Sequence, residues 1–200
     1  MTWEALTIVG TIAFAASGAI TAMEEDYDIL GVYILALVTA FGGGAVRNLL
    51  IGVPISVLWE QGELFLIALI TTTILFLVPN MFSKYVKAWM MFDAMGLAAF
   101  AIQGALYAAE MDRPISAVMV AALLTGSGGG VIRDVLAGRK PLVFRDEIYA
   151  LWAMLGGLAI GLGWGRSAAE LLALWAVIVV LRMLSIRYKW NLPKRRLRKP

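Results

Sequence analysis

Seven long runs of uncharged, mostly apolar residues divide this chain, and they limit its possible folds more than any other feature. Six runs contain no Asp, Glu, Lys or Arg, and the seventh has only Glu170 near its start and Arg182 near its end. A helix needs about 20 apolar residues to cross the hydrocarbon core of a bilayer. We therefore predict an all-α integral membrane protein with seven transmembrane helices. The runs are Ala5–Met23, Ile29–Val46, Leu64–Ser83, Ala94–Ala109, Pro114–Ile132, Ile148–Gly165 and Ser167–Ile186.

The composition argues against a soluble protein and against most enzymes. Hydrophobic residues make up 61% of the chain and charged residues 16%, compared with roughly 45–50% and 25% in soluble domains. The sequence has no cysteine, which excludes disulfides and thiolate metal sites. It has no histidine, which excludes imidazole metal ligands and Ser-His or Cys-His nucleophile pairs. We therefore expect neither an enzyme nor a metal or cofactor site. Runs of this length also exceed the strands of a membrane β-barrel.

Basic residues are concentrated at one side of the expected membrane spans. By the positive-inside rule, this predicts a multi-pass protein of the inner (plasma) membrane with its N-terminus outside and its C-terminus in the cytoplasm. The C-terminal tail is the most basic segment, and next to a span such a tail is more typical of binding to anionic lipid headgroups than to nucleic acid. The basic residues on the expected inner side are Lys84, Lys87, Arg139, Lys140, Arg145, Arg187, Lys189, Lys194, Arg195, Arg196, Arg198 and Lys199.

The chain contains an internal repeat with an offset of 86 residues. Gly10–Gly52 aligns with Gly96–Gly138 without a gap, and 20 of the 43 aligned positions are identical. Each copy holds three expected helices, and because three is odd, the second copy enters the membrane from the opposite side. The sequence thus predicts two inverted repeats, an architecture typical of transporters. The expected parts are residues 1–86 and 87–166 for the repeats, 167–188 for the seventh helix and 189–200 for the basic tail.

Each copy carries three consecutive glycines in its second helix, at Gly42, Gly43 and Gly44 and at Gly128, Gly129 and Gly130. Glycine weakens a helix by roughly 1 kcal/mol per residue relative to alanine. A break at these points would free backbone carbonyls, which can replace the water around a cation. Close helix packing is the alternative use of the glycines. We favour a break that lines a permeation path. Three hydroxyl groups lie within one helical turn of the triplets, those of Thr39, Thr125 and Ser127. They either line the same path or donate hydrogen bonds back to carbonyls of their own helix.

Five ionisable residues lie directly beside the charge-free runs or within the seventh run, at a depth in the membrane where an unpaired charge costs several kcal/mol. Arg47 and Arg133 each follow a glycine triplet by three residues. We interpret them as gating elements, clamps on helix carbonyls or halves of ion pairs, with snorkelling to lipid phosphates as the alternative. We expect Asp93 to pair with Arg133, and Arg182 is the alternative partner of Asp93. Asp134 follows Arg133 directly, so the two side chains should point apart, and Asp134 should pair elsewhere or attract cations.

The glycine motif resembles a known family. Gly-Gly-Gly-x-x-Arg followed by Asn or Asp, in the second helix of each three-helix copy, resembles the prokaryotic trimeric intracellular cation (TRIC) channel family, also described as the UPF0126 or glycine transporter domain family. Phe92–Leu97 and Gly138–Pro141 fit the same pattern, and the resemblance covers Gly10 to about Gly165. It implies a homotrimer in which each protomer has its own pore for monovalent cations, chiefly potassium.

The two copies differ at positions that carry charge. Thr7 stands where the second copy has Asp93, and Asn48 stands where it has Asp134. We therefore expect the two ends of the path to differ electrostatically despite the repeat. The aligned polar residues that we expect to make interhelical hydrogen bonds are Ser17 and Gln103.

Two functions remain open from the sequence. The first is a passive potassium channel whose pore forms around glycine-broken second and fifth helices. The second is a secondary carrier for a small zwitterion such as glycine, with the carboxylate at a helix N-terminus and the ammonium group at Asp93. A scaffold that transports nothing is a weaker third hypothesis, because it leaves the repeated glycines unexplained. The chain has no P-loop motif, which argues against ATP-driven transport.

Overall fold

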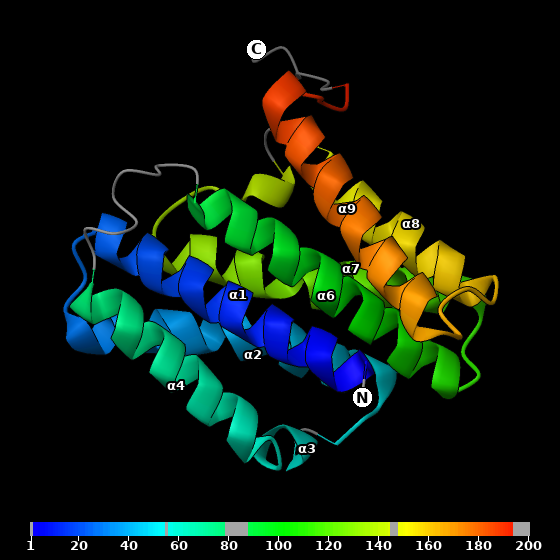
Figure 1. The fold of residues 1–200 in the computed structure, drawn as a ribbon, viewed down its shortest axis with the longest axis horizontal. Coiled ribbons are helices and arrows are strands. Elements are labelled where there is room, and N and C mark those ends of the chain that lie inside the picture. Colours follow the sequence, from blue (N-terminus) through cyan, green and yellow to red (C-terminus); the bar gives the residue numbers. More distant parts are fainter. Residues whose placement is uncertain (1, 55, 79–87, 145–147, 194–200) are drawn as a thin grey trace, which may run out of the picture.

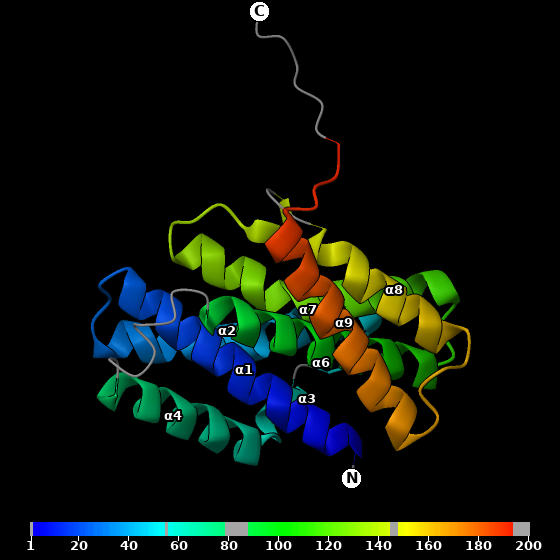
Figure 2. The same cartoon turned by 45° about the horizontal axis from the view of Figure 1, so that its top comes forward.

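The protein is a bundle of α-helices, seen from two directions in Figures 1 and 2. The computed structural model describes residues 2–54, 56–78, 88–144 and 148–193. The elements in this part of the chain are α1 (Thr2–Glu24), α2 (Ile29–Ile51), α3 (Ser56–Trp59), α4 (Gly62–Leu77), α6 (Ala88–Glu110), α7 (Ile115–Leu136), the short 3-10 helix η1 (Leu142–Phe144), α8 (Tyr149–Gly161) and α9 (Ala168–Tyr188).

Each of the seven predicted spans overlaps one helix of the described residues, but the helices differ in length, and residues 79–83 of the third span lie outside the described part. Among the described residues, α1, α2, α6, α7 and α9 are long and apolar enough to cross a membrane. α4 and α8 are apolar but shorter, with 16 and 13 residues. α8 is followed by Gly163 and Gly165, whose positive φ angles end regular helix. The basic residues Lys84, Lys87 and Arg145, and those from Lys194 onward, lie outside the described part of the chain.

The turns that end the helices recur 86 residues apart. Asp26 after α1 and Asp112 after α6 both adopt left-handed backbone, with φ of 56° and 52°. Gly52 after α2 and Gly138 after α7 do the same, with φ of 83° and 69°. Glycine adopts this conformation freely and aspartate tolerates it, so both residue types are suited to ending a helix. The local backbone therefore follows the same repeat as the sequence.

Four helices form the centre of the bundle, where α1 and α2 pack against α6 and α7. The rings of Phe14 in α1 and Phe100 in α6 have centroids 5.1 Å apart. A side chain at Gly96 would collide with the ring of Phe14, and one at Gly10 would come within 3.3 Å of the ring of Phe100. Because these are aligned positions of the repeat, the same contact is made twice in opposite directions.

The remaining helices cover this centre. α4 packs on α1 and α2, α8 packs on α7 and α6, and α9 lies across α6 and α8. Large apolar side chains stay exposed on the outside of the bundle, where a soluble protein rarely leaves a broad apolar surface and where a bilayer would cover it. They include Leu30, Leu49, Leu66, Leu77, Leu172 and Val180.

Candidate functional site

Both glycine triplets lie inside uninterrupted α-helices, so the predicted helix breaks are wrong. α2 and α7 are helical through the triplets. A Cβ on Gly43 would collide with the carbonyl oxygen of Thr125, and a Cβ on Gly129 would collide with the carbonyl oxygen of Thr39. The glycines therefore let the backbones of α2 and α7 cross in direct contact, as small residues do in membrane helices. This close packing supports regular helix despite the low helix propensity of glycine.

Gly44 is the exception within the first triplet. A Cβ there would meet nothing closer than Nη2 of Arg47, at 3.8 Å. Gly44 thus faces a space beside the arginine, whereas the other positions are enclosed by neighbouring helices. The enclosed positions are Gly42 against Ile132, Gly128 against Gly43, and the buried Gly130.

The hydroxyl groups near the triplets donate to carbonyl oxygens of their own helices. Thr39, Thr125 and Ser127 each donate to the carbonyl four residues earlier, at 2.6 Å. Thr39 also packs against Gly18 of α1, and Thr125 packs against Gly104 of α6. Of the two roles that the sequence left open, these contacts correspond to hydroxyls that bond back to the helix.

Arg133 of α7 is the centre of a buried ionic network. Its Nη1 donates to Oδ1 of Asp93 on α6 and to Oγ of Ser17 on α1, both at 2.6 Å. The structure thus brings Arg133 together with Asp93, the partner that the sequence favoured. Both residues are 0% exposed, so the guanidinium group is held inside the bundle and does not snorkel to lipid phosphates. Buried, charge-assisted hydrogen bonds of this length are among the strongest in proteins.

Asp134 also binds Arg133, which contradicts the expectation that the two point apart. Nε and Nη2 of Arg133 donate to Oδ1 of Asp134 at 2.9 and 2.7 Å. The expectation considered only the directions of the Cβ atoms, but a guanidinium group on a long flexible stem can fold back to its neighbour. Oδ2 of Asp134 accepts from the backbone N–H of Leu142 at 3.1 Å, which links the segment after α7 to the network.

Arg182 of α9 completes a group of four buried charges. It is 1% exposed and lies within electrostatic range of both Asp93 and Arg133. From the sequence, Arg182 was the alternative to Arg133 as the partner of Asp93, but the structure places both arginines in one cluster. Two guanidinium groups and the carboxylates of Asp93 and Asp134 are buried together, so their charges compensate and the cost of removing them from water falls.

Arg47 of α2 repeats the geometry of Arg133 without its acids. Its Nε and Nη2 donate to Oδ1 of Asn48 at 3.0 and 2.7 Å, and its Nη1 donates to Oε1 of Gln103 on α6 at 3.4 Å. Nε2 of Gln103 in turn donates to Oγ1 of Thr7 on α1, at 3.3 Å. The Cζ atom of Arg47 lies 4.2 Å from the ring centroid of Tyr107, a cation–π contact. Among the described residues, no carboxylate lies within ion-pair distance of Arg47.

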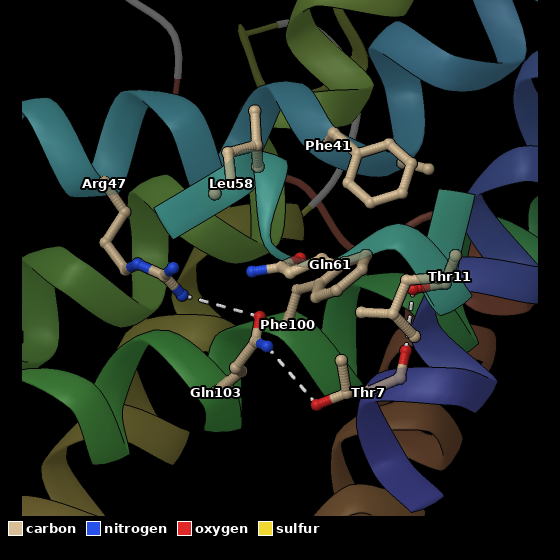
Figure 3. A pocket seen from close by; sticks show the side chains of 11 residues that line it. Thr7, Thr11, Phe41, Arg47, Leu58, Gln61, Phe100 and Gln103 are labelled. Atoms are coloured by element: carbon tan, nitrogen blue, oxygen red, sulfur yellow. Dashed lines mark hydrogen bonds between the residues drawn. The ribbon is translucent and has the colours of Figure 1, made fainter. Parts of the chain in front are cut away.

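A cavity opens beside Arg47, and Figure 3 shows the side chains that converge on it. The narrow inner part has a volume of about 20 Å³. It adjoins a wider pocket of about 490 Å³, which shares Thr7, Gln61 and Gln103 with it and reaches the exposed Glu4 and Glu63. The inner part is lined by the polar residues Thr7, Thr11, Arg47, Gln61 and Gln103, and by Ala40, Phe41, Gly44, Leu58, Leu64 and Phe100.

The sequence predicted part of these networks. The interhelical hydrogen bonds expected of Ser17 and Gln103 are confirmed. Tyr107 and Gln61 were missed. Tyr107 follows Gln103 by four residues on α6, so helical spacing could have indicated that both face Arg47. Gln61 lies in the connection between α3 and α4, where no periodic pattern indicates which way a side chain faces.

Comparison with known sequences identifies a family of membrane proteins. The chain matches the glycine transporter family over residues 4–80 and 90–164, two segments that begin 86 residues apart. It is similar to the UPF0126 membrane protein YvgT of Bacillus subtilis (strain 168), with 63% identity over 99% of this chain and 98% of that protein. It is also similar to the UPF0126 inner membrane protein YadS of Escherichia coli (strain K12), with 34% identity over 94% of this chain and 93% of that protein.

Comparison with solved structures leads to the same family. A structure described as the structural basis for conductance through TRIC cation channels has a TM-score of 0.85 and 31% identity, with full coverage of both chains. A prokaryotic TRIC channel crystallised in 0.5 M KCl has a TM-score of 0.86 and 32% identity, over 95% of this chain and 98% of that chain. This chain therefore belongs to the prokaryotic TRIC channel family, which is also described as the UPF0126 or glycine transporter family of membrane proteins.

Proposed function

We propose that this protein is a potassium-permeable cation channel in which each protomer of a homotrimer has its own pathway. The observation that carries the proposal is the likeness, over the whole chain, to a TRIC cation channel at a TM-score of 0.85 and 31% identity. The buried charged networks add support, because ionisable residues inside a membrane bundle mark ion pathways.

The proposed pathway runs between α1, α2, α6 and α7, from the cavity beside Arg47 to the network around Arg133. The cavity supports this route, because polar side chains from several elements meet there. Side chains line the path in this proposal, since α2 and α7 are continuous and free no carbonyls. Arg47 and Arg133 act as gates, because each reaches across to a helix of the other half. When an ion passes, the bond from Arg47 to Gln103 lengthens, and so do the bonds from Arg133 to Asp93 and Ser17.

The proposed membrane arrangement has seven spans, formed by two inverted three-helix repeats and α9. Its support is the reciprocal Phe14–Phe100 contact, the turns that recur 86 residues apart and the two matching family segments. The orientation, with the C-terminus and its lipid-binding tail in the cytoplasm, rests on the basic residues. A reporter fused after Pro200 should report the cytoplasm, and a reporter inserted in the Asp112–Pro114 turn should report the outside of the cell. The reverse pattern would overturn the orientation.

Reconstitution separates a channel from a carrier. Purified protein in planar bilayers should give unitary current steps in symmetric KCl, and proteoliposomes should release potassium without valinomycin. A carrier would instead give saturable uptake of radiolabelled glycine and no unitary steps.

A matched pair of variants tests the route. Gly44→Leu fills the space beside Arg47 and should reduce potassium flux at least tenfold. Gly62→Leu, at the start of α4, adds the same side chain where nothing lies within 4 Å, and should leave flux near the wild-type value. Equal flux through both variants would exclude a path through the cavity.

A carrier for a small zwitterion is the second candidate, and the cavity favours it in a changed form. Asp93 is engaged by Arg133 and no longer suits the ammonium group. In the changed form Arg47 holds the carboxylate, and the ammonium group faces Glu63 in the wider pocket. Glycine uptake that is lost on Arg47→Gln and persists in Asp93→Glu would favour this candidate.

A further inference from the structure

The charge of Arg47 is the least compensated in the two networks. Arg47 is 3% exposed, and its hydrogen-bond acceptors are the neutral amides of Asn48 and Gln103. The bond from Nη1 to Gln103 is long, at 3.4 Å, whereas Nη1 of Arg133 reaches Asp93 at 2.6 Å. A buried guanidinium group without a counter-charge is costly in a low-dielectric interior.

The repeat explains where the missing counter-charge would lie. Thr7 aligns with Asp93, and Asn48 aligns with Asp134, so the first half lacks both carboxylates of the second half. The side chain of Thr7 is shorter than that of Asp93 and lines the cavity beside Arg47. The cavity therefore lies on the side of Arg47 that corresponds to the carboxylate of Asp93 in the other network.

The inner cavity suits one small group that accepts hydrogen bonds. Its volume of about 20 Å³ exceeds the roughly 10–15 Å³ that one water molecule requires. Figure 3 shows Arg47, Gln61 and Gln103 directed toward this space, and these side chains supply N–H donors. Phe41, Leu58 and Phe100 form apolar walls, which lower the local dielectric constant and strengthen the attraction of Arg47 for negative charge.

From these observations we infer that the inner cavity is a binding site for a small monoanionic group, held by Arg47 where Asp93 holds Arg133. The group is a chloride ion or the carboxylate of a small amino acid, which share this chemistry. The exposed Glu4 and Glu63 in the wider pocket oppose entry of a free anion but suit the ammonium group of an amino acid. The effect of occupancy on potassium flux rests on the proposed function, whereas binding itself does not.

Thermal unfolding tests the site without reference to transport. The purified protein is melted in sodium isethionate, a larger sulfonate, after exchange of part of the isethionate for chloride, and after addition of glycine to the isethionate buffer, so that ionic strength stays constant. At ten times the dissociation constant, the ligand that binds should raise Tm by roughly 3–6 °C. A rise with chloride identifies the halide, and a rise with glycine alone identifies the carboxylate of the amino acid.

Three variants assign the rise to the cavity. Thr7→Asp introduces the carboxylate of the second half, so Tm in isethionate should approach the ligand-bound wild-type value and the ligand effect should disappear. Arg47→Gln should also abolish the ligand effect. Arg113→Gln removes an exposed positive charge whose Nη2 contacts the carbonyl of Ile51, and it should keep the full effect.

Two results would overturn the inference. One is a wild-type Tm that is equal in isethionate, chloride and glycine. The other is a ligand effect that remains in Thr7→Asp at the size seen in Arg113→Gln. Because Thr7→Asp adds a counter-charge and removes none, it decides the outcome even if Arg47→Gln does not fold.

Discussion

The networks around Arg47 and Arg133 share a hydrogen-bond geometry but differ in charge. Each arginine folds back through Nε and Nη2 onto the next residue, and each extends Nη1 to the first helix of the opposite half. Around Arg133 the acceptors include two carboxylates, and the cluster is sealed inside the bundle. Around Arg47 they are amides, and a cavity adjoins the guanidinium group. The repeated backbone thus fixes the direction of each arginine, while single substitutions at aligned positions decide whether its charge is compensated.

The largest effect in this comparison should follow removal of Asp93. Asp93→Asn removes one carboxylate from the buried group around Arg133 and Arg182, and breaking a buried pair costs about 3–5 kcal/mol. Adding Arg133→Gln should recover part of this loss, because a removed pair costs less than a lone buried charge. Melting curves of the single and double variants measure both terms. The aligned control, Thr7→Val, loses the neutral hydrogen bond from Gln103 and should cost about 0.5–1.5 kcal/mol. Equal losses at the two positions would contradict the difference in charge.

The second-largest loss of stability is expected at the crossing of α2 and α7, where each half contributes one glycine in contact with the opposite backbone. Gly43→Ala and Gly129→Ala press a methyl group against a backbone carbonyl and should each destabilise the protein by about 1–3 kcal/mol. Flux should fall only in proportion to the folded protein that is lost. Gly44→Ala meets no close atom and serves as the control, with Tm equal to or above that of the wild type. Lost flux with an unchanged Tm in the first two variants would restore a pore-lining role for the triplets.

Exchanging the residues that follow the arginines should sharpen the comparison with a smaller effect. Asp134→Asn keeps an acceptor for Arg133 but loses its charge, and should cost about 1–2 kcal/mol. Asn48→Asp should act in the opposite direction, since it gives Arg47 a carboxylate. The measurement is the change in Tm of each variant. A loss of stability in both would show that the two sites differ in more than charge.

The smallest effect is expected at the surface of the Arg133 side. Arg139 donates to Glu25 at 2.6 Å and to Glu24 at 2.9 Å. Burial lowers the pKa of Arg139, but its hydrogen bonds to Glu25 and Glu24 outweigh this and raise the pKa above its ordinary value. Arg139→Gln should nevertheless cost less than about 1 kcal/mol, because partly exposed ion pairs are screened by water. The cost should shrink further with added salt, and a salt-independent loss would indicate a buried role.

Much of the fold follows from patterns that are local in the sequence. Long apolar runs, six of them free of charge, predicted helices at seven places where the described residues are helical, because lipid requires apolar segments whose backbone is hydrogen-bonded internally. The aligned turn residues Asp26 and Asp112 adopt the same left-handed backbone. The pairing of Arg133 with Asp93 was also predictable, because a buried guanidinium group needs an acid and few acids are available at that depth.

Sequence alone determined which segments form helices, where the chain repeats and which residues carry charge inside the bundle. Tertiary structure decided how these are used. Glycine lowers helix propensity wherever it occurs, but only the tertiary structure shows that Gly43 and Gly129 lie where the backbones of α2 and α7 are in contact. Asp134 binds Arg133 because a long side chain can fold back, which residue spacing does not reveal. The cavity beside Arg47 exists because Thr7 is short and Gln61 enters from another segment, and a space between side chains is defined only when the helices have come together.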